Sequence, residues 1–238
     1  MKKKYMVTAC VLILAVCLCP GIHGRTDQEP LYIKAAYIMA GEGMLRLVKE
    51  QYKEKPRIAL TFDDGPNARY TPGLLDGLKE REVHATFFLM GKNIEGNEEL
   101  VRRMKEEGHL IGNHTYNHVQ LDRLSRENAC QEVLKTNNII YEVTGEYPMY
   151  LRPPYGAWPK NLELCVSMLP VFWDIDTLDW KSENVDSVMG IIRNQAHDGA
   201  VILMHDGYES SVSAALMAVD FLKKEGYEFV TADKLITD

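Results

Sequence analysis

The stretch Ile58–Pro66, with the sequence IALTFDDGP, carries the strongest indication of the fold. Its first five residues form a short, almost wholly apolar run of strand length, and two carboxylates, Asp63 and Asp64, follow at once. Strands that are apolar on both faces are typical of parallel sheets covered by helices. The change to two aspartates marks the carboxyl end of the strand, and the Gly-Pro that follows is a common turn dipeptide.

The same alternation continues outward from this stretch. The apolar runs predict strands at 58–62, 85–89, 110–112, 149–151, 171–175, 200–204 and 228–230. Between them the pattern predicts helices at 72–81, 97–107, 159–168, 185–195 and 212–224, and a long helix from a Ser125 cap to about Val143, stopped by Gly145. About seven strand–helix units indicate an α/β fold, a distorted (β/α)7-type barrel, with a doubly wound open sheet as the alternative.

The N-terminus has the pattern of an export signal. Three lysines precede an apolar stretch from Met6 to Cys19, which is short for a membrane span of about 20 residues. We therefore expect residues 1–24 to be a signal peptide or, as second choice, a signal anchor. Residues 25–55 are interpreted as a lead-in segment or stalk, and 56–238 as the catalytic domain. The expected location is outside the cell, either secreted or held at the cell surface by an N-terminal membrane tether.

Composition limits the partners. The 238 residues carry a net charge of −7, with no basic cluster beyond the N-terminus, which argues against nucleic acid. We expect a monomer.

Three of the five cysteines lie in the predicted leader. We interpret the other two, Cys130 and Cys165, as buried free thiols, with a disulfide as the alternative, since sequence alone shows no proximity.

Polar residues follow the predicted strands at their carboxyl ends. In a parallel barrel these ends meet at one face, where catalytic residues are found, so we expect them to converge. The residues concerned are Asp63 and Asp64 after the first strand, His114 and His118 after the third, Arg152 after the fourth, Asp176 and Asp179 after the fifth, and His205 after the sixth.

The residue types fit a metal-assisted hydrolase. His114 and His118 are four residues apart, and on a helical turn they would face the same way and suit one metal ion. One carboxylate from another strand end would complete a triad with an open position, as in catalytic zinc sites. A carboxylate beside His205 would raise its pKa and make it a candidate general acid. Each feature also has a purely structural alternative, such as a turn or a buried histidine.

Five motifs in this order resemble the polysaccharide deacetylase family, also called the NodB-homology domain or carbohydrate esterase family 4. They are Thr61 to Pro66, His114 with His118, Arg152 to Gly156, Asp176 to Trp180, and Leu203 to His205. The resemblance covers about Pro56 to the C-terminus. It implies the fold of that family, a distorted barrel of roughly seven strands.

The resemblance implies a role for each residue. The metal, usually zinc, would be held by Asp64, His114 and His118. Asp63 would be the general base, and Arg152 would keep it ionised. His205 would protonate the departing amine, with Asp179 adjusting its pKa.

Three further residues would contact the substrate. The backbone N–H of Tyr155 would face the oxyanion, Trp180 would form part of the groove wall, and Leu203 would border the pocket for the acetyl methyl group.

The function that the resemblance implies is removal of N-acetyl groups from N-acetylglucosamine residues of a glycan. Peptidoglycan is the leading substrate and chitin oligosaccharide the next. The alternatives are an O-acetyl esterase acting on xylan-type polysaccharide and a non-catalytic glycan-binding protein of the cell surface.

Overall fold

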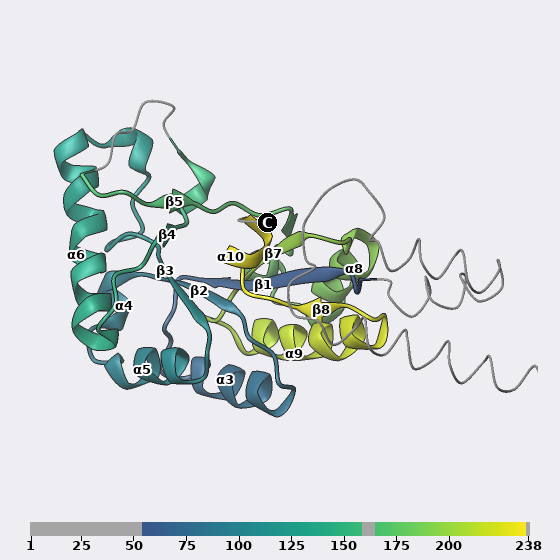
Figure 1. Cartoon of the computed structure of the whole chain (residues 1–238). Coiled ribbons are helices and arrows are strands. Elements are labelled where there is room, and N and C mark those ends of the chain that lie inside the picture. Colours follow the sequence, from purple (N-terminus) through teal and green to yellow (C-terminus); the bar gives the residue numbers. More distant parts are fainter. Residues whose placement is uncertain (1–53, 159–164, 237–238) are drawn as a thin grey trace, which may run out of the picture. The chain divides into compact units, whose positions relative to one another are not determined.

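The computed structural model of the chain describes residues 54–158 and 165–236 (Figure 1). The predicted leader, nearly all of the lead-in segment and most of the helix predicted at 159–168 lie outside the described residues. Within the described ranges, no helix has the length and apolar character needed to cross a membrane.

A parallel sheet forms the centre of the domain. β1 (Arg57–Asp63) is an interior strand and pairs with β2 (Thr86–Leu89) on one side and β7 (Ala200–His205) on the other. The strand order is β5-β4-β3-β2-β1-β7-β6, and β8 also pairs with β1. The remaining strands are β3 (Leu110–Asn113), β4 (Tyr150–Leu151), β5 (Leu169–Pro170), β6 (Ile175–Asp176) and β8 (Glu228–Phe229).

Helices cover the outer face of this sheet (Figure 1). The longer ones are α3 (Thr71–Glu80), α5 (Glu98–Glu106), α6 (Arg126–Thr144), α8 (Val185–Gln195) and α9 (Glu209–Lys224). Short turns complete the described part: α4 (Gly91–Ile94), η1 (Leu121–Arg123), η2 (Pro154–Gly156), α7 (Asp179–Ser182) and α10 (Asp233–Ile236). The predicted caps of α6 are confirmed, since Ser125 accepts a hydrogen bond from the Asn128 amide and Gly145 adopts the left-handed conformation.

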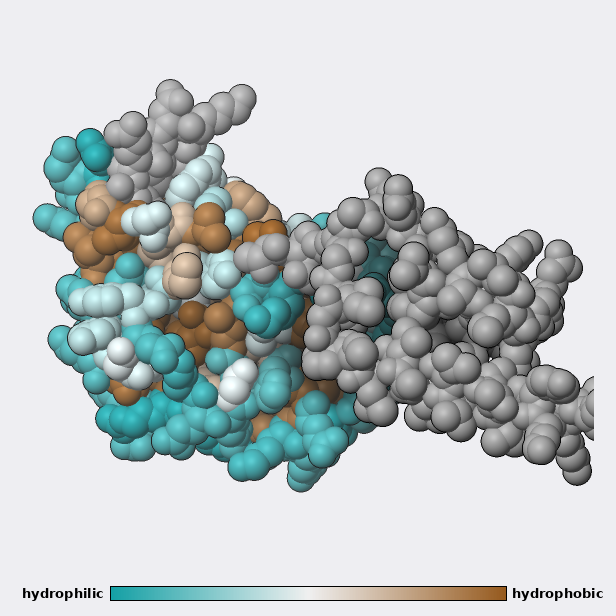
Figure 2. Space-filling view, in the orientation of Figure 1, coloured by the Kyte–Doolittle hydropathy of each residue, from teal (hydrophilic) through white to brown (hydrophobic). Residues whose placement is uncertain are grey.

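The two faces of β1 have different neighbours. Ile58, Leu60 and Phe62 pack in the main core beneath the helices. Ala59 belongs to a second cluster on the other face, inside the curl of the sheet. Because side chains alternate along a strand, Thr61 and Asp63 share the inner face with Ala59. Figure 2 shows a hydrophilic surface over α3 and α5 and hydrophobic residues in the middle of the view, where the sheet lies.

The predicted distorted (β/α)7-type barrel is confirmed, and one predicted strand is wrong. Residues 171–174 are not a strand, and β5 and β6 lie on either side of them as separate short strands at opposite ends of the hydrogen-bonded order. The carbonyl oxygens of Val171 and Phe172 accept hydrogen bonds from the Arg152 guanidinium instead of from a neighbouring strand. Residues 165–168, the described end of the helix predicted at 159–168, are not helical either.

Candidate active site

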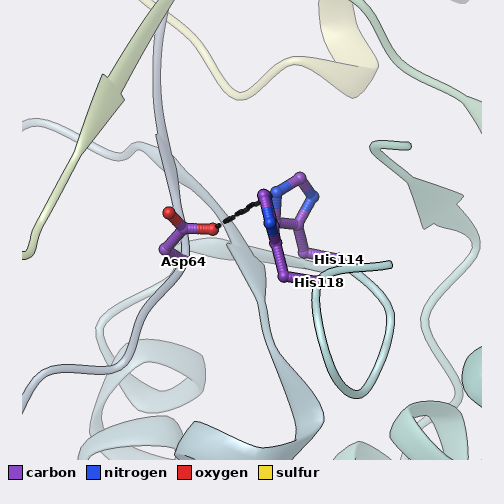
Figure 3. A group of neighbouring side chains, drawn as sticks. All are labelled: Asp64, His114 and His118. Atoms are coloured by element: carbon purple, nitrogen blue, oxygen red, sulfur yellow. Dashed lines mark ion pairs between the residues drawn. The ribbon is translucent and has the colours of Figure 1, made fainter. Parts of the chain in front are cut away.

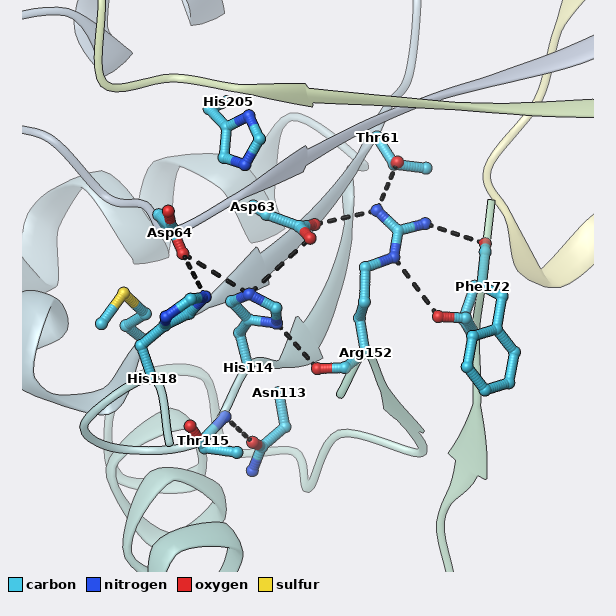
Figure 4. A network of polar contacts seen from close by, with 12 residues as sticks. Thr61, Asp63, Asp64, Asn113, His114, Thr115, His118, Arg152, Phe172 and His205 are labelled. Carbon is cyan, nitrogen blue, oxygen red and sulfur yellow. Dashed lines mark hydrogen bonds and ion pairs between the residues drawn. The ribbon is translucent and has the colours of Figure 1, made fainter. Parts of the chain in front are cut away.

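The predicted polar residues come together at the carboxyl ends of the strands (Figure 4). Asp63 ends β1 and Asp64 follows it, His114 follows β3, Arg152 follows β4, and His205 ends β7. Asp179 begins α7, three residues after β6. Asp176 ends β6, and its side chain accepts a hydrogen bond from the Leu178 amide, so it shapes the turn into α7.

Asp64, His114 and His118 form a candidate metal-binding triad (Figure 3). The Nε2 atoms of both histidines lie 3.4 Å from Oδ1 of Asp64. Zinc bonds to nitrogen and oxygen of about 2.1 Å in a tetrahedron place two ligand atoms about 3.4 Å apart. Each histidine nitrogen therefore has the spacing from the Asp64 oxygen that two ligands of one small cation have, and the three donor atoms lie within 4.8 Å of one another.

Two further observations fit a cation at this triad. Oδ1 of Asp64 is buried and has no hydrogen-bond partner, which is costly for a carboxylate oxygen. His114 has Nδ1 2.7 Å from the carbonyl oxygen of Arg152, which fixes this nitrogen as the N–H donor and leaves the lone pair of Nε2 facing Asp64.

The electrostatics favour the ligating forms of Asp64 and His118. Burial raises the pKa of Asp64, but the two neighbouring histidines outweigh it and bring that pKa down to about 2. Burial lowers the pKa of His118, which favours the neutral ring. An ionised carboxylate and neutral imidazoles are the forms that bind metal ions.

The local structure around the histidines differs from the prediction. His114 and His118 lie in a loop and not on a helical turn. Thr115 and His118 adopt left-handed backbone conformations, with φ of 63° and 59°. Such conformations are unfavourable for these residue types and persist only where surrounding contacts impose them.

Two polar residues supply those contacts. The Asn113 side chain accepts a hydrogen bond from the Thr115 amide at 2.6 Å and donates to α6 through the Val133 carbonyl. The Glu132 carboxylate, on α6, accepts bonds from the amides of Tyr116 and Asn117 at 3.1 and 2.8 Å. It also accepts a third bond from the Asn117 side chain. Helix α6 thus holds the loop that carries both histidines.

Asp63 and Arg152 form a buried ion pair beside the triad. Arg152 is fully buried and its Nη1 donates to Oδ1 of Asp63 at 2.8 Å and to the Thr61 hydroxyl at 2.6 Å. The other oxygen of Asp63 lies 3.7 Å from Nε2 of His114, next to the triad but outside it. Burial lowers the pKa of Arg152, and Asp63 opposes that effect.

His205 and Asp179 form a second pair. Figure 4 shows His205 across the two aspartates from His114 and His118. Asp179 accepts two bonds from His205, from Nδ1 at 2.9 Å and from the backbone amide at 2.8 Å. Burial lowers the pKa of His205, but Asp179 outweighs it and raises that pKa to about 9. His205 is therefore protonated at neutral pH.

The three residues expected to contact substrate lie in different environments. Tyr155 is 69% exposed, has φ of 61°, and its ring stands edge-on to His118 at 4.7 Å. Trp180, on α7, is 48% exposed. Leu203 is buried on β7, where it is paired with Thr61 of β1 on one side and with Asp176 of β6 on the other.

Sequence reasoning missed several residues that shape the site. Thr61, Asn113 and Glu132 support the base and the histidine loop, as described above. Asp206 is fully buried, accepts a hydrogen bond from the Thr71 hydroxyl, and burial raises its pKa to about 6. A Cβ on Gly65 would lie 2.6 Å from Oδ2 of Asp206, so the aspartate loop requires glycine there. The sequence places Asp206 with His205 after the sixth predicted strand, but the pattern alone gave it no role.

A barrel whose strand ends hold a carboxylate–dihistidine triad between a paired aspartate and a protonated histidine has the parts of a metal-assisted hydrolase. The model of the polysaccharide deacetylase family matches residues 50–171. The chain belongs to this family, as the sequence motifs predicted.

Individual relatives agree with this assignment. The peptidoglycan-N-acetylglucosamine deacetylase PgdA of Listeria monocytogenes is 42% identical over 183 residues, which are 77% of this chain and 39% of that protein. A peptidoglycan-N-acetylglucosamine deacetylase of Bacillus cereus is 39% identical over 74% of this chain and 67% of its own length. The solved structure of peptidoglycan deacetylase PdaC from Bacillus subtilis has a TM-score of 0.75 at 40% identity, covering 77% of this chain and 91% of the other. The chain spans about two fifths of the length of PgdA.

Proposed function

We propose that this chain is a zinc-dependent deacetylase that removes N-acetyl groups from N-acetylglucosamine residues of peptidoglycan. The observation that carries the proposal is the placement of the Asp64, His114 and His118 triad between two charged pairs, Asp63 with Arg152 and His205 with Asp179. Hydrolysis of an amide needs a base for water and an acid for the leaving amine, and this site offers one of each.

The triad would hold the metal. Zinc bound by Asp64, His114 and His118 would supply Lewis-acid polarisation of the acetyl carbonyl and lower the pKa of a water molecule. The donor set of two imidazoles and one carboxylate suits zinc and is also compatible with other divalent transition metals.

Asp63 would act as the general base. The buried guanidinium of Arg152 stabilises its ionised form by a charge-assisted hydrogen bond at 2.8 Å. Since one oxygen of Asp63 is bound to Arg152 and the other faces the triad, the second oxygen is the one placed to take a proton from water.

His205 would act as the general acid. Its Nδ1 is bound to Asp179, so its Nε2 is the atom that would donate a proton to the departing amine. A pKa of about 9 keeps that proton in place over the neutral range. We also propose that Tyr155, Trp180 and Leu203 bind the sugar and its acetyl group.

The substrate is the most specific part of the proposal. PgdA and the Bacillus cereus relative are named for N-acetylglucosamine, while the Bacillus subtilis relative PdaC is named for N-acetylmuramic acid. We propose N-acetylglucosamine because two of these three relatives are named for it. A lysine-flanked apolar N-terminus supports export to the cell surface, secreted or tethered by that segment. We propose a monomer.

Acetate release provides the test. Purified protein reconstituted with zinc is incubated separately with peptidoglycan, chitin oligosaccharides and acetylated xylan. The proposal predicts acetate from peptidoglycan, with free amines on glucosamine, and loss of this activity in Asp63→Asn. Acetate from xylan alone would favour an O-acetyl esterase, and glycan binding without acetate release would favour a non-catalytic protein.

A further inference from the structure

Cys130 and Cys165 lie next to each other, although 35 positions separate them in sequence. Cys130 lies in the second turn of α6, and Cys165 begins the described segment that leads into β5. The backbone amide of Cys165 donates a hydrogen bond to Sγ of Cys130 at 2.9 Å. The expectation of two buried thiols is wrong for Cys165, which is exposed, while Cys130 is buried.

This contact brings the two thiols within reach of each other. Sγ of Cys130 touches the main chain of Cys165, so rotation about the Cα–Cβ bond of Cys165 moves its sulfur over the space beside Sγ of Cys130. Burial and the direct interaction with Cys130 together raise the pKa of the Cys165 thiol to about 11. We propose that Cys130 and Cys165 form a disulfide that ties the segment leading into β5 to α6.

The position of the bond gives it a structural effect on the site. The chain between the two cysteines contains Arg152, which holds Asp63, and Tyr155, which stands against His118. Next to Cys130 on the helix, Ala129 and Val133 pack in a cluster with Val166 and Met168 of the Cys165 segment. The Val133 carbonyl in turn accepts from Asn113, which holds the histidine loop. A disulfide here therefore restrains the segment that carries Arg152, the residue that binds Asp63.

The chemistry requires an oxidant, which we take to be a small-molecule or protein disulfide. The exposed Cys165, as thiolate, attacks the external disulfide, forms a mixed disulfide and releases one thiol. The thiolate of Cys130 then attacks the sulfur of Cys165 and releases the second thiol. Two protein thiols and one disulfide thus give one protein disulfide and two small thiols. The high pKa of Cys165 predicts a slow uncatalysed reaction near neutral pH that accelerates at higher pH.

The test is made on the full chain. Reduced protein is equilibrated with excess oxidised glutathione, remaining thiols are alkylated with N-ethylmaleimide, and peptides are mapped by mass spectrometry without reduction. We expect a peptide pair joined through Cys130 and Cys165. A loop of this length predicts a melting temperature about 10 °C higher in the oxidised than in the reduced form.

Variants separate the disulfide from other effects of oxidation. Cys165→Ser changes an exposed residue and is expected to abolish both the linked peptide and the redox dependence of the melting temperature. Cys130→Ala is the second variant and is expected to do the same. Full alkylation of both cysteines after oxidation, or linkage of either one to Cys10, Cys17 or Cys19 instead, would overturn the proposal. Equal melting temperatures of the oxidised and reduced forms would overturn its restraining effect.

Discussion

The carbonyl oxygen of Arg152 lies 2.7 Å from Nδ1 of His114, so one residue supports both the metal triad and the base. Its main chain orients His114, while its guanidinium binds Asp63 at 2.8 Å. The two functions of Arg152 are therefore separable by mutation, because a side-chain substitution keeps the carbonyl. This separation leads to the first prediction.

Arg152→Met is expected to abolish turnover while zinc binding is retained. The substitution leaves the buried Asp63 carboxylate unpaired, which is expected to lower the free energy of unfolding by about 3–5 kcal/mol. Denaturant unfolding and zinc stoichiometry measure the two effects. Arg152→Lys keeps the positive charge but loses the planar set of N–H donors. It is therefore expected to lower turnover and stability less than Arg152→Met does. Loss of zinc in a folded Arg152→Met protein would contradict the proposed division of roles.

Asp63→Asn is expected to lower kcat by about 100- to 10,000-fold with little change in zinc affinity. The carboxylate lies beside the triad but is not one of its three members, and the amide keeps its shape while losing the basic oxygen. Steady-state kinetics and metal analysis of the same preparation provide the measurement. Activity close to that of the unchanged protein would exclude Asp63 as the base.

Asp179→Asn is expected to move the alkaline limit of activity to lower pH. In the unchanged protein Asp179 raises the pKa of His205 to about 9, so the acid stays protonated up to that pH. Without the charge and hydrogen bond of Asp179, the largest effect that opposes burial is removed, so the pKa of His205 falls. A pH–rate profile of both proteins measures the shift, and coincident alkaline limbs would show that His205 is not the acid.

The same pKa predicts a pH dependence of stability. The folded-state pKa of His205 is raised, so its stabilising contribution is complete below about pH 6.5 and is lost as the pH rises through about 9. The difference in unfolding free energy between the unchanged protein and Asp179→Asn is therefore expected to shrink over this interval. Urea unfolding at a series of pH values measures it, and a difference that grows with pH would contradict the assignment.

Glu132→Ala is expected to weaken zinc binding by about 10- to 100-fold, because the carboxylate holds the loop that presents both histidines. Glu132→Gln is expected to restore most of the affinity, since an amide oxygen still accepts from the two backbone amides. Glu142→Ala, an exposed glutamate on the same helix, is the matched control. Zinc titration against a competing chelator measures all three, and equal losses in the Ala and Gln variants would contradict a positioning role.

The site residues were predictable from sequence because each interrupts an apolar run at a strand end. Asp63, His114 and His205 all follow that rule, and a parallel sheet brings such positions to one edge. The rule depends only on local pattern and on the topology of the sheet, so it does not require knowledge of any contact.

The features that were not predicted depend on long-range contacts. Residues 171–174 have strand-like composition, but the carbonyl groups of Val171 and Phe172 accept hydrogen bonds from Arg152, about 20 positions away. The histidine loop is held in left-handed conformations by Asn113 and Glu132, and the spacing of the histidines alone suggested a helical turn. Glu132 itself lies among other polar residues of a helix, and nothing in its local sequence distinguishes it.

Release of acetate from peptidoglycan, measured with and without zinc, tests whether this protein is a zinc-dependent deacetylase. Protein stripped by a chelator is divided in two, one part is reloaded with one equivalent of zinc, and the muropeptides that each produces are compared by mass spectrometry. We expect glucosamine residues lacking the acetyl group only with the reloaded protein, and none with reloaded Asp63→Asn. Equal deacetylation by the stripped and reloaded proteins, or none by the reloaded protein carrying one bound zinc, would rule out a zinc-dependent deacetylase.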